Sequence, residues 1–364
     1  MRVAHRGDWS DLHPGRLRRA LLVLGLFSPA CEDRPPLPPV VFEGEHLRYR
    51  TFEAAEEVCA GTFFALDSKA GYMQELFGTS TVIDYSWIPD DRYLEHCPAP
   101  KACAIGTEAF ALDPVVEHEI AHAAHRSAFL PFEEGLAVYF GDGGARDVAA
   151  NGTLDALQRT SVGIADYGRL GRFVSFLVAE FGLEDVLAIA DAAPRGVSPE
   201  AFASTLESQL GVPLEEVVRD YEDRYPECPP MNYRHDQPYC DQPPRFTLTA
   251  GMGAETVDFD FDLPCDDEAT LGTRSGERWR YETFTVPERT AYVLTLTPNV
   301  EGAGSFVVLE QCGTSCFDDD FSSAIESYEQ EIACLDAGTY VVRLALDDDT
   351  AQGFHFSARP VGWC

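Results

Sequence analysis

Apolar positions recur with two different spacings along this chain, and the change falls near residue 227. In the first half, apolar residues return every three or four positions, as on one face of an α-helix. The longest such stripe ends at Met73 and Phe77 and is followed by Gly78, a residue type that commonly ends a helix. Shorter apolar runs between these stripes predict strands. We expect helices over 53–77, 170–181, 183–192, 199–210 and 214–225, and strands over 46–50, 81–87 and 102–111.

In the second half the helical spacing disappears, and apolar residues alternate with polar ones as in half-buried strands. Tyr292, Leu294 and Leu296 show this alternation clearly. Regular short strands separated by turns predict an antiparallel β-sandwich over 245–364. A connector over 227–244, rich in Cys and Pro, separates it from the first half. A chain of 364 residues with this organisation is expected to form two domains and to be α+β in class.

The N-terminus has the three regions of a secretory signal peptide over residues 1–30. A basic segment precedes an apolar run over 20–27, which is too short to span a bilayer. Signal peptidase I could cut after Ala30, or Cys31 could carry a lipid as in bacterial lipoproteins. Eleven cysteines are an odd number, and lipidation of Cys31 leaves ten, enough for five disulfides. We therefore favour a lipid anchor at Cys31, a Pro-rich tether over 31–44, and an extracytoplasmic location, either at the cell surface, in the periplasm or secreted.

The charge of the chain is strongly acidic, with a formal net charge of −34. Removing residues 1–30, which carry five Arg and two acidic residues, takes it to −37. Such a surface repels nucleic acid and anionic lipid headgroups. We therefore expect no nucleic-acid partner, and membrane contact only through an N-terminal lipid anchor.

The segment His118-Glu119-Ile120-Ala121-His122 carries the most specific chemistry in the chain. Residues four apart lie on one face of a helix, so His118 and His122 can hold one metal ion, and imidazole nitrogens suit Zn²⁺. Glu119 lies next to the first of these ligands, where it can take a proton from a bound water. Asp113 is expected to cap this helix, with Pro114 at its first position.

The third metal ligand decides the class of zinc site. A metzincin has Gly and then His after the second histidine, but His125 and Ala128 stand at those positions. Pro131 is expected to end the first helix and to turn the chain back, which brings a glutamate of the following helix near the histidines. The spacing leaves both Glu133 and Glu134 open as that ligand.

The motif, with Glu134-Gly135-Leu136-Ala137 after it, resembles the gluzincin superfamily of zinc metallopeptidases, which includes thermolysin and aminopeptidase N. The resemblance implies a zincin-like domain over 45–226 and selects Glu134 as the third ligand, because the ligand glutamate there often precedes a Gly-hydrophobic-Ala step. Tyr167 matches the segment in which aminopeptidase-like members carry a transition-state tyrosine. Core packing is an equally reasonable role for this residue. An edge strand, here 102–107, pairs with the substrate in such enzymes; an ordinary sheet edge is the alternative.

The second half has its own resemblance. Trp279 to Val286, together with the Leu335-Asp336-Ala337-Gly338-Thr339-Tyr340 segment, resembles the pre-peptidase C-terminal domain attached to many secreted bacterial peptidases. The resemblance implies a β-sandwich that accompanies a peptidase.

We therefore expect one catalytic Zn²⁺ and a peptide or protein substrate. Peptide bonds would be hydrolysed through a zinc-activated water, with Glu119 as general base. The alternative is a surface lipoprotein that uses a zincin scaffold and the β-sandwich for binding. A structural zinc site is disfavoured, because three protein ligands leave the fourth position open.

Other polar features are expected to be structural. The Asp triplets at 318–320 and 347–349 could bind Ca²⁺, but solvated turns are the expected state. His125 is expected to be exposed or packed, and Glu117 and Glu133 to be solvated or to support the ligands from behind.

Overall fold

The computed structural model describes residues 35–125, 128–141, 152–224, 239–240, 242–251, 255–301, 303–312, 322–326, 330–346 and 353–364. The expected signal peptide, Cys31, most of the 227–244 connector and both Asp triplets lie outside these residues. Helices and strands both occur, so the α+β class agrees with the structure.

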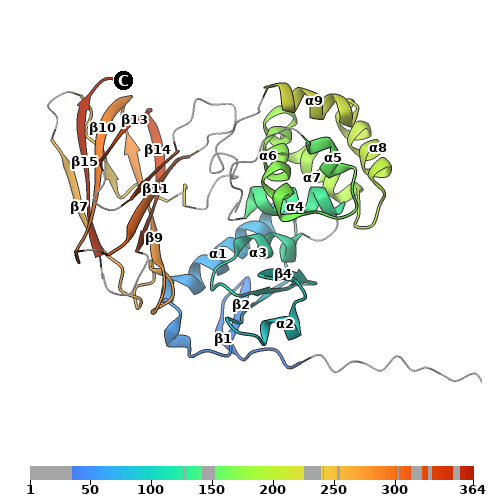
Figure 1. Cartoon of the computed structure of the whole chain (residues 1–364), viewed down its shortest axis with the longest axis horizontal. Coiled ribbons are helices and arrows are strands. Elements are labelled where there is room, and N and C mark those ends of the chain that lie inside the picture. Colours follow the sequence, from blue (N-terminus) through green and yellow to red (C-terminus); the bar gives the residue numbers. More distant parts are fainter. Residues whose placement is uncertain are drawn as a thin grey trace, which may run out of the picture. The chain divides into compact units, whose positions relative to one another are not determined.

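The first half contains a five-stranded mixed sheet in the order β1-β2-β3-β5-β4. Figure 1 labels β1, β2 and β4 of this sheet. Strands β2, β3 and β5 are parallel, and β1 and β4 run antiparallel at the two edges. The expected single strand over 102–111 is wrong, because Gly106 at φ 67° turns the chain and divides it into β4 and β5. The strands are β1 Val40–Glu43, β2 Leu47–Thr51, β3 Ile83–Trp87, β4 Ala102–Ile105 and β5 Glu108–Ala111.

Helices α1 and α3 pack against this sheet. The helices that come after α3 in the chain share one continuous apolar core with α1, α3 and the sheet. The expected bounds of α7 and α8 are confirmed, and α2 and α5 are short helices that the spacing did not predict. The described α-helices are α1 Ala60–Phe77, α2 Tyr93–His96, α3 Glu117–Ala124, α4 Leu130–Phe140, α5 Thr153–Leu157, α6 Ile164–Phe181, α7 Leu183–Ala192, α8 Pro199–Leu210 and α9 Leu214–Arg224; a 3₁₀ turn lies at Ala55–Glu57.

Helix α1 begins at Ala60, later than the expected start at 53, because its N-terminal donors are bonded to a distant segment. The backbone N–H groups of Cys59 and Ala60 donate to the carbonyl oxygens of Gly272 and Cys265, at 3.0 and 2.8 Å. Cys59 and Cys265 also form a disulfide. The unpaired N–H groups that every helix N-terminus presents are thus satisfied by backbone carbonyls, without a side-chain cap.

Helix α3 likewise begins later than expected. It starts at Glu117 and has no side-chain cap, so the expected cap at Asp113 and first position at Pro114 are wrong. The Tyr85 hydroxyl donates to the Asp113 carbonyl and the Tyr49 hydroxyl to the Pro114 carbonyl, each at 3.1 Å. These bonds from buried tyrosines of the sheet hold the segment outside the helix.

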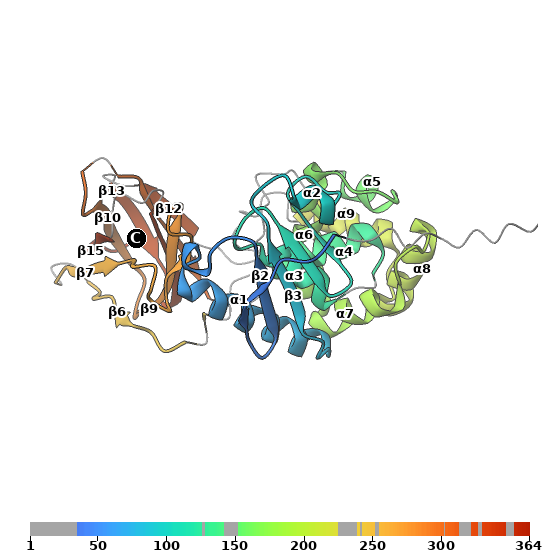
Figure 2. The same ribbon diagram turned by 90° about the horizontal axis from the view of Figure 1, so that it is seen from below.

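The second half contains two sheets that share one apolar core (Figure 2). One sheet has the order β13-β10-β15-β7, and the other has the order β12-β11-β14-β9-β6 with β8 paired to β9. The pairing is antiparallel except between β6 and β9. The strands are β6 Phe246–Thr247, β7 Val257–Asp262, β8 Leu271–Gly272, β9 Arg278–Val286, β10 Thr290–Pro298, β11 Ser305–Gln311, β12 Ser322–Glu326, β13 Gln330–Leu335, β14 Gly338–Leu346 and β15 Gly353–Gly362.

Cysteines of the described residues are joined in disulfides, which indicate an oxidising, extracytoplasmic environment. No helix in the described part of the chain is both long enough and apolar enough to cross a membrane. Cys31, Cys228 and Cys316 lie outside the described residues. The disulfides among the described residues are Cys59–Cys265, Cys97–Cys103, Cys240–Cys312 and Cys334–Cys364.

A buried ion pair fixes the start of α3 against α1. Lys69 Nζ lies 3.0 Å from Glu117 Oε2, and the side chains are 5% and 11% exposed. Glu117 is therefore buried and paired, which corrects the expectation of a solvated residue or one behind the ligands. Removing one partner from such a pair leaves an uncompensated buried charge, which is strongly destabilising.

We expect Lys69→Ala to lower the free energy of unfolding by about 3 kcal/mol, because the Glu117 carboxylate loses its partner. Urea unfolding followed by circular dichroism would measure the loss. The matched control is Lys69→Met with Glu117→Leu, which removes both charges at similar volume and should recover most of the stability. A Lys69→Ala loss below about 0.5 kcal/mol, the size typical of exposed pairs, would contradict this account.

Candidate metal centre

Helix α3 supplies two imidazoles and a carboxylate to one buried site. All eight of its residues are buried, including His118, Glu119 and His122. Ile120 is fully buried in the core and fixes the rotation of the helix. Polar side chains are buried at a high free-energy cost unless partners satisfy them, so a short helix with this composition requires such partners.

Helix α4 supplies Glu134, and two glycines let this helix approach its neighbours. A Cβ atom on Gly135 would lie 2.8 Å from the carbonyl oxygen of Leu170 in α6. A Cβ atom on Gly141, just after α4, would lie 2.7 Å from the backbone of His118. Both distances are shorter than real contacts, so glycine is required at each position. Pro131 lies in the first turn of α4, which begins at Leu130, and α3 already ends at Ala124, so the expectation that Pro131 ends the preceding helix is wrong.

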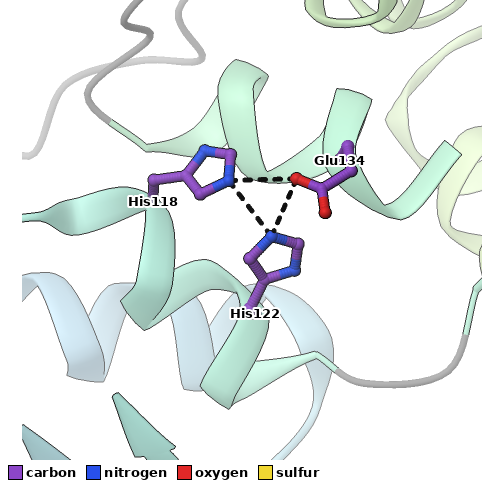
Figure 3. Close-up of side chains that lie close together, drawn as sticks. All are labelled: His118, His122 and Glu134. Atoms are coloured by element: carbon purple, nitrogen blue, oxygen red, sulfur yellow. Dashed lines mark hydrogen bonds and ion pairs between the residues drawn. The ribbon is translucent and has the colours of Figure 1, made fainter. Parts of the chain in front are cut away.

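The three candidate ligand atoms form a nearly equilateral triangle (Figure 3). His118 Nε2 lies 3.1 Å from His122 Nε2, and Glu134 Oε2 lies 3.2 Å from each of them. Two ligands held about 2.05 Å from a tetrahedral ion would lie roughly 3.3 Å apart. The triangle therefore has nearly the size of one face of a tetrahedral zinc site, and the residues fit a zinc ion.

The electrostatics of the triangle favour a cation. Burial lowers the pKa of His122, but its contacts with Glu133 and Glu134 outweigh burial and raise that pKa to about 10. Burial raises the pKa of the Glu134 carboxyl, but hydrogen bonds from His118 and His122 lower it below its usual range. Both shifts mean that the carboxylates stabilise positive charge at the imidazoles.

Glu133 supports His122 from the side opposite the triangle. Its Oε1 lies 3.3 Å from His122 Nδ1, and its side chain is 4% exposed. A carboxylate on the second nitrogen of a ligand histidine fixes the ring and its tautomer, leaving Nε2 free to bind metal. The expectation that Glu133 lies behind the ligands is therefore met in this geometry.

Glu119 and Tyr167 line the same cavity as the triangle, which has a volume of about 150 Å³. The Tyr167 ring stacks on that of His118, with centroids 5.5 Å apart and planes inclined by 8°. Burial and the nearby Glu134 carboxylate raise the pKa of Tyr167, so its hydroxyl keeps its proton and can donate. The structure thus places a carboxylate and a phenol beside the candidate ligands.

Strand β4 forms one wall of the cavity. Ala102, Cys103 and Ala104 line it, and β4 is the last strand in the order of its sheet. Because these side chains are small, the backbone of β4 mainly shapes this side of the cavity. A larger cavity of about 450 Å³, lined in part by Trp279 and Arg343, does not include the three candidate ligands.

The structure agrees with the expectation for His125 and adds Arg195 to the site. His125 is packed: its ring contacts Phe77 at 4.6 Å between centroids, and its Nε2 lies 3.3 Å from Asp191. Arg195 lines the cavity but was not predicted. Its Pro194-Arg195-Gly196 context indicates a turn, and no local pattern links a turn 61 positions after Glu134 to the metal triangle.

Comparisons with known proteins add little. No protein-family model and no curated protein matches the chain. The pre-peptidase C-terminal domain of collagenase from Bacillus anthracis is 12% identical, covers 33% of this chain and 99% of its own, and has a TM-score of 0.22. The structure of TmCBM61 in complex with beta-1,4-galactotriose is 12% identical, covers 29% and 66%, and has a TM-score of 0.15.

Proposed function

We propose that the protein is an extracytoplasmic zinc metallopeptidase of the gluzincin type, with a zincin-like domain followed by a β-sandwich. The observation that carries the proposal is the triangle of His118, His122 and Glu134, with buried Glu119 in the same cavity. When bound there, zinc would supply a Lewis acid that polarises a peptide carbonyl and acidifies a water molecule.

The chain's own residues supply the remaining steps in this proposal. Glu119 accepts a proton from the attacking water and passes it to the leaving amine. The Tyr167 hydroxyl donates to the oxygen that becomes negative in the transition state. Glu133 holds the His122 ring in orientation. A protein that only binds has no need of a buried carboxylate at Glu119, which favours the enzyme over the scaffold alternative.

Metal removal tests the proposal directly. The purified mature protein should contain one zinc per chain by elemental analysis, and should cleave peptides from a mixed library. Treatment with a chelator should remove the zinc and at least about 99% of the cleavage, and added Zn²⁺ should restore both. A zinc-loaded protein that cleaves no peptide would favour the alternative, a lipid-anchored surface protein that uses the scaffold for binding.

A further inference from the structure

Arg195 brings a positive charge to a cavity that is otherwise lined by carboxylates, imidazoles, small side chains and the Tyr167 phenol. It follows α7 in the turn that begins at Pro194, and Ala128 and Pro194 form an isolated bridge that holds this turn near the start of α4. Among the described lining residues it is the one Lys or Arg, and Glu119, Glu133 and Glu134 are the carboxylates. Its charge therefore changes what the cavity can bind.

The contacts of Arg195 leave most of its guanidinium available. Its Nε lies 3.8 Å from Glu133 Oε2, beyond hydrogen-bonding distance, and the side chain is 57% exposed. Among the described residues, this contact with Glu133 is the one ion pair of Arg195. Glu133 Oε1 meanwhile contacts His122 Nδ1. Glu133 thus lies between a candidate ligand and the guanidinium, and Arg195 lines the same cavity as the metal triangle.

Simple neutralisation of Glu133 does not account for this geometry. A guanidinium that served only to neutralise a 4% exposed carboxylate would form a short, forked pair with it. Here the carboxylate is buried while the guanidinium remains more than half exposed, and Glu133 Oε2 has no hydrogen-bond partner among the described residues. The forked donors of Arg195 are therefore free to bind a planar, doubly accepting group.

We propose that Arg195 binds a carboxylate of the substrate, so that the enzyme prefers peptides with a carboxylate close to the scissile bond. This specificity rests on the proposed peptidase function. The carboxylate is either the free C-terminus of the peptide or an Asp or Glu side chain. The acidic surface opposes such substrates at long range, but salt screens that repulsion over about 10 Å, whereas the contact with Arg195 is short.

The test compares isosteric peptides on the mature wild-type protein and on Arg195→Gln. One set pairs Glu with Gln at each position near the cleaved bond, and a second pairs a free C-terminus with its amide. Wild type should favour the carboxylate member of one set by about tenfold in kcat/KM, because a forked pair with a carboxylate adds strong, directional hydrogen bonds. The ratio should fall close to one in Arg195→Gln and be intermediate in Arg195→Lys, which keeps the charge without the fork. The responding set identifies the source of the carboxylate.

A binding measurement makes the test independent of turnover. In a Glu119→Gln background, fluorescence anisotropy with the same labelled peptides should show about tenfold tighter binding of the carboxylate member. That difference should disappear in Glu119→Gln with Arg195→Gln. Equal kcat/KM and equal Kd within every pair would overturn the proposal and leave the peptidase function standing. A uniform loss of activity and of zinc in Arg195→Gln, with the ratio unchanged, would also overturn it, by showing that Arg195 only supports Glu133. If the wild type binds the carboxylate peptides more tightly but cleaves none of the peptides, the carboxylate-binding role of Arg195 is supported and the proposed peptidase function is refuted.

Discussion

Replacing Glu134 by alanine should abolish stoichiometric zinc, because two imidazoles would then have to hold the ion without the carboxylate oxygen 3.2 Å from each of them. We expect the affinity for Zn²⁺ to fall by more than about a hundredfold, beyond the effect typical of residues that only support ligands. Competition with a chromogenic chelator would measure the affinity, and elemental analysis the content.

Glu133→Ala is the matched control for this change, since it makes the same substitution at the neighbouring glutamate. Glu133 contacts the His122 nitrogen that faces away from the triangle, so its loss should weaken zinc binding by about 10–100-fold and leave most of the zinc bound at saturating metal. If zinc is lost on changing Glu133 and kept on changing Glu134, the third ligand is Glu133. Full zinc in both variants would refute the gluzincin type of site.

The sequence predicts α8 well, because both of its ends are set locally. Helix α8 begins after Ser198, whose side chain accepts from the N–H of Ala201, and ends before Gly211 at φ 72°. Each of these signals lies within the helix or beside it, which is why the expected bounds of α8 agree with the structure.

The sequence fails where distant residues set an end. The start of α1 depends on carbonyls near residue 270, about 200 positions away, and the start of α3 depends on Tyr49 and Tyr85 in the sheet. The site divides in the same way. Spacing on one helix places His118 and His122 together, but the choice between Glu133 and Glu134 and the presence of Arg195 depend on how separate elements pack.

Replacing Glu119 by glutamine should separate catalysis from metal binding at one side chain. Glu119 lines the cavity with the triangle but is not one of its three candidate ligands. Gln has nearly the same size, so zinc content and melting temperature should stay close to those of wild type. Gln cannot accept a proton at neutral pH, so kcat/KM should fall at least about a hundredfold, the usual contribution of a general base.

The outcome has meaning only if the zinc content of each variant is measured beside its rate, because metal loss alone stops the chemistry. Glu119→Asp is a useful companion, since it keeps a carboxylate but withdraws it by one methylene; it should retain zinc and recover part of the rate. A zinc-loaded Glu119→Gln protein that cleaves as fast as wild type would refute Glu119 as the base. Loss of rate with full zinc, partly recovered in Glu119→Asp, is the result that a proton-accepting carboxylate at this position requires.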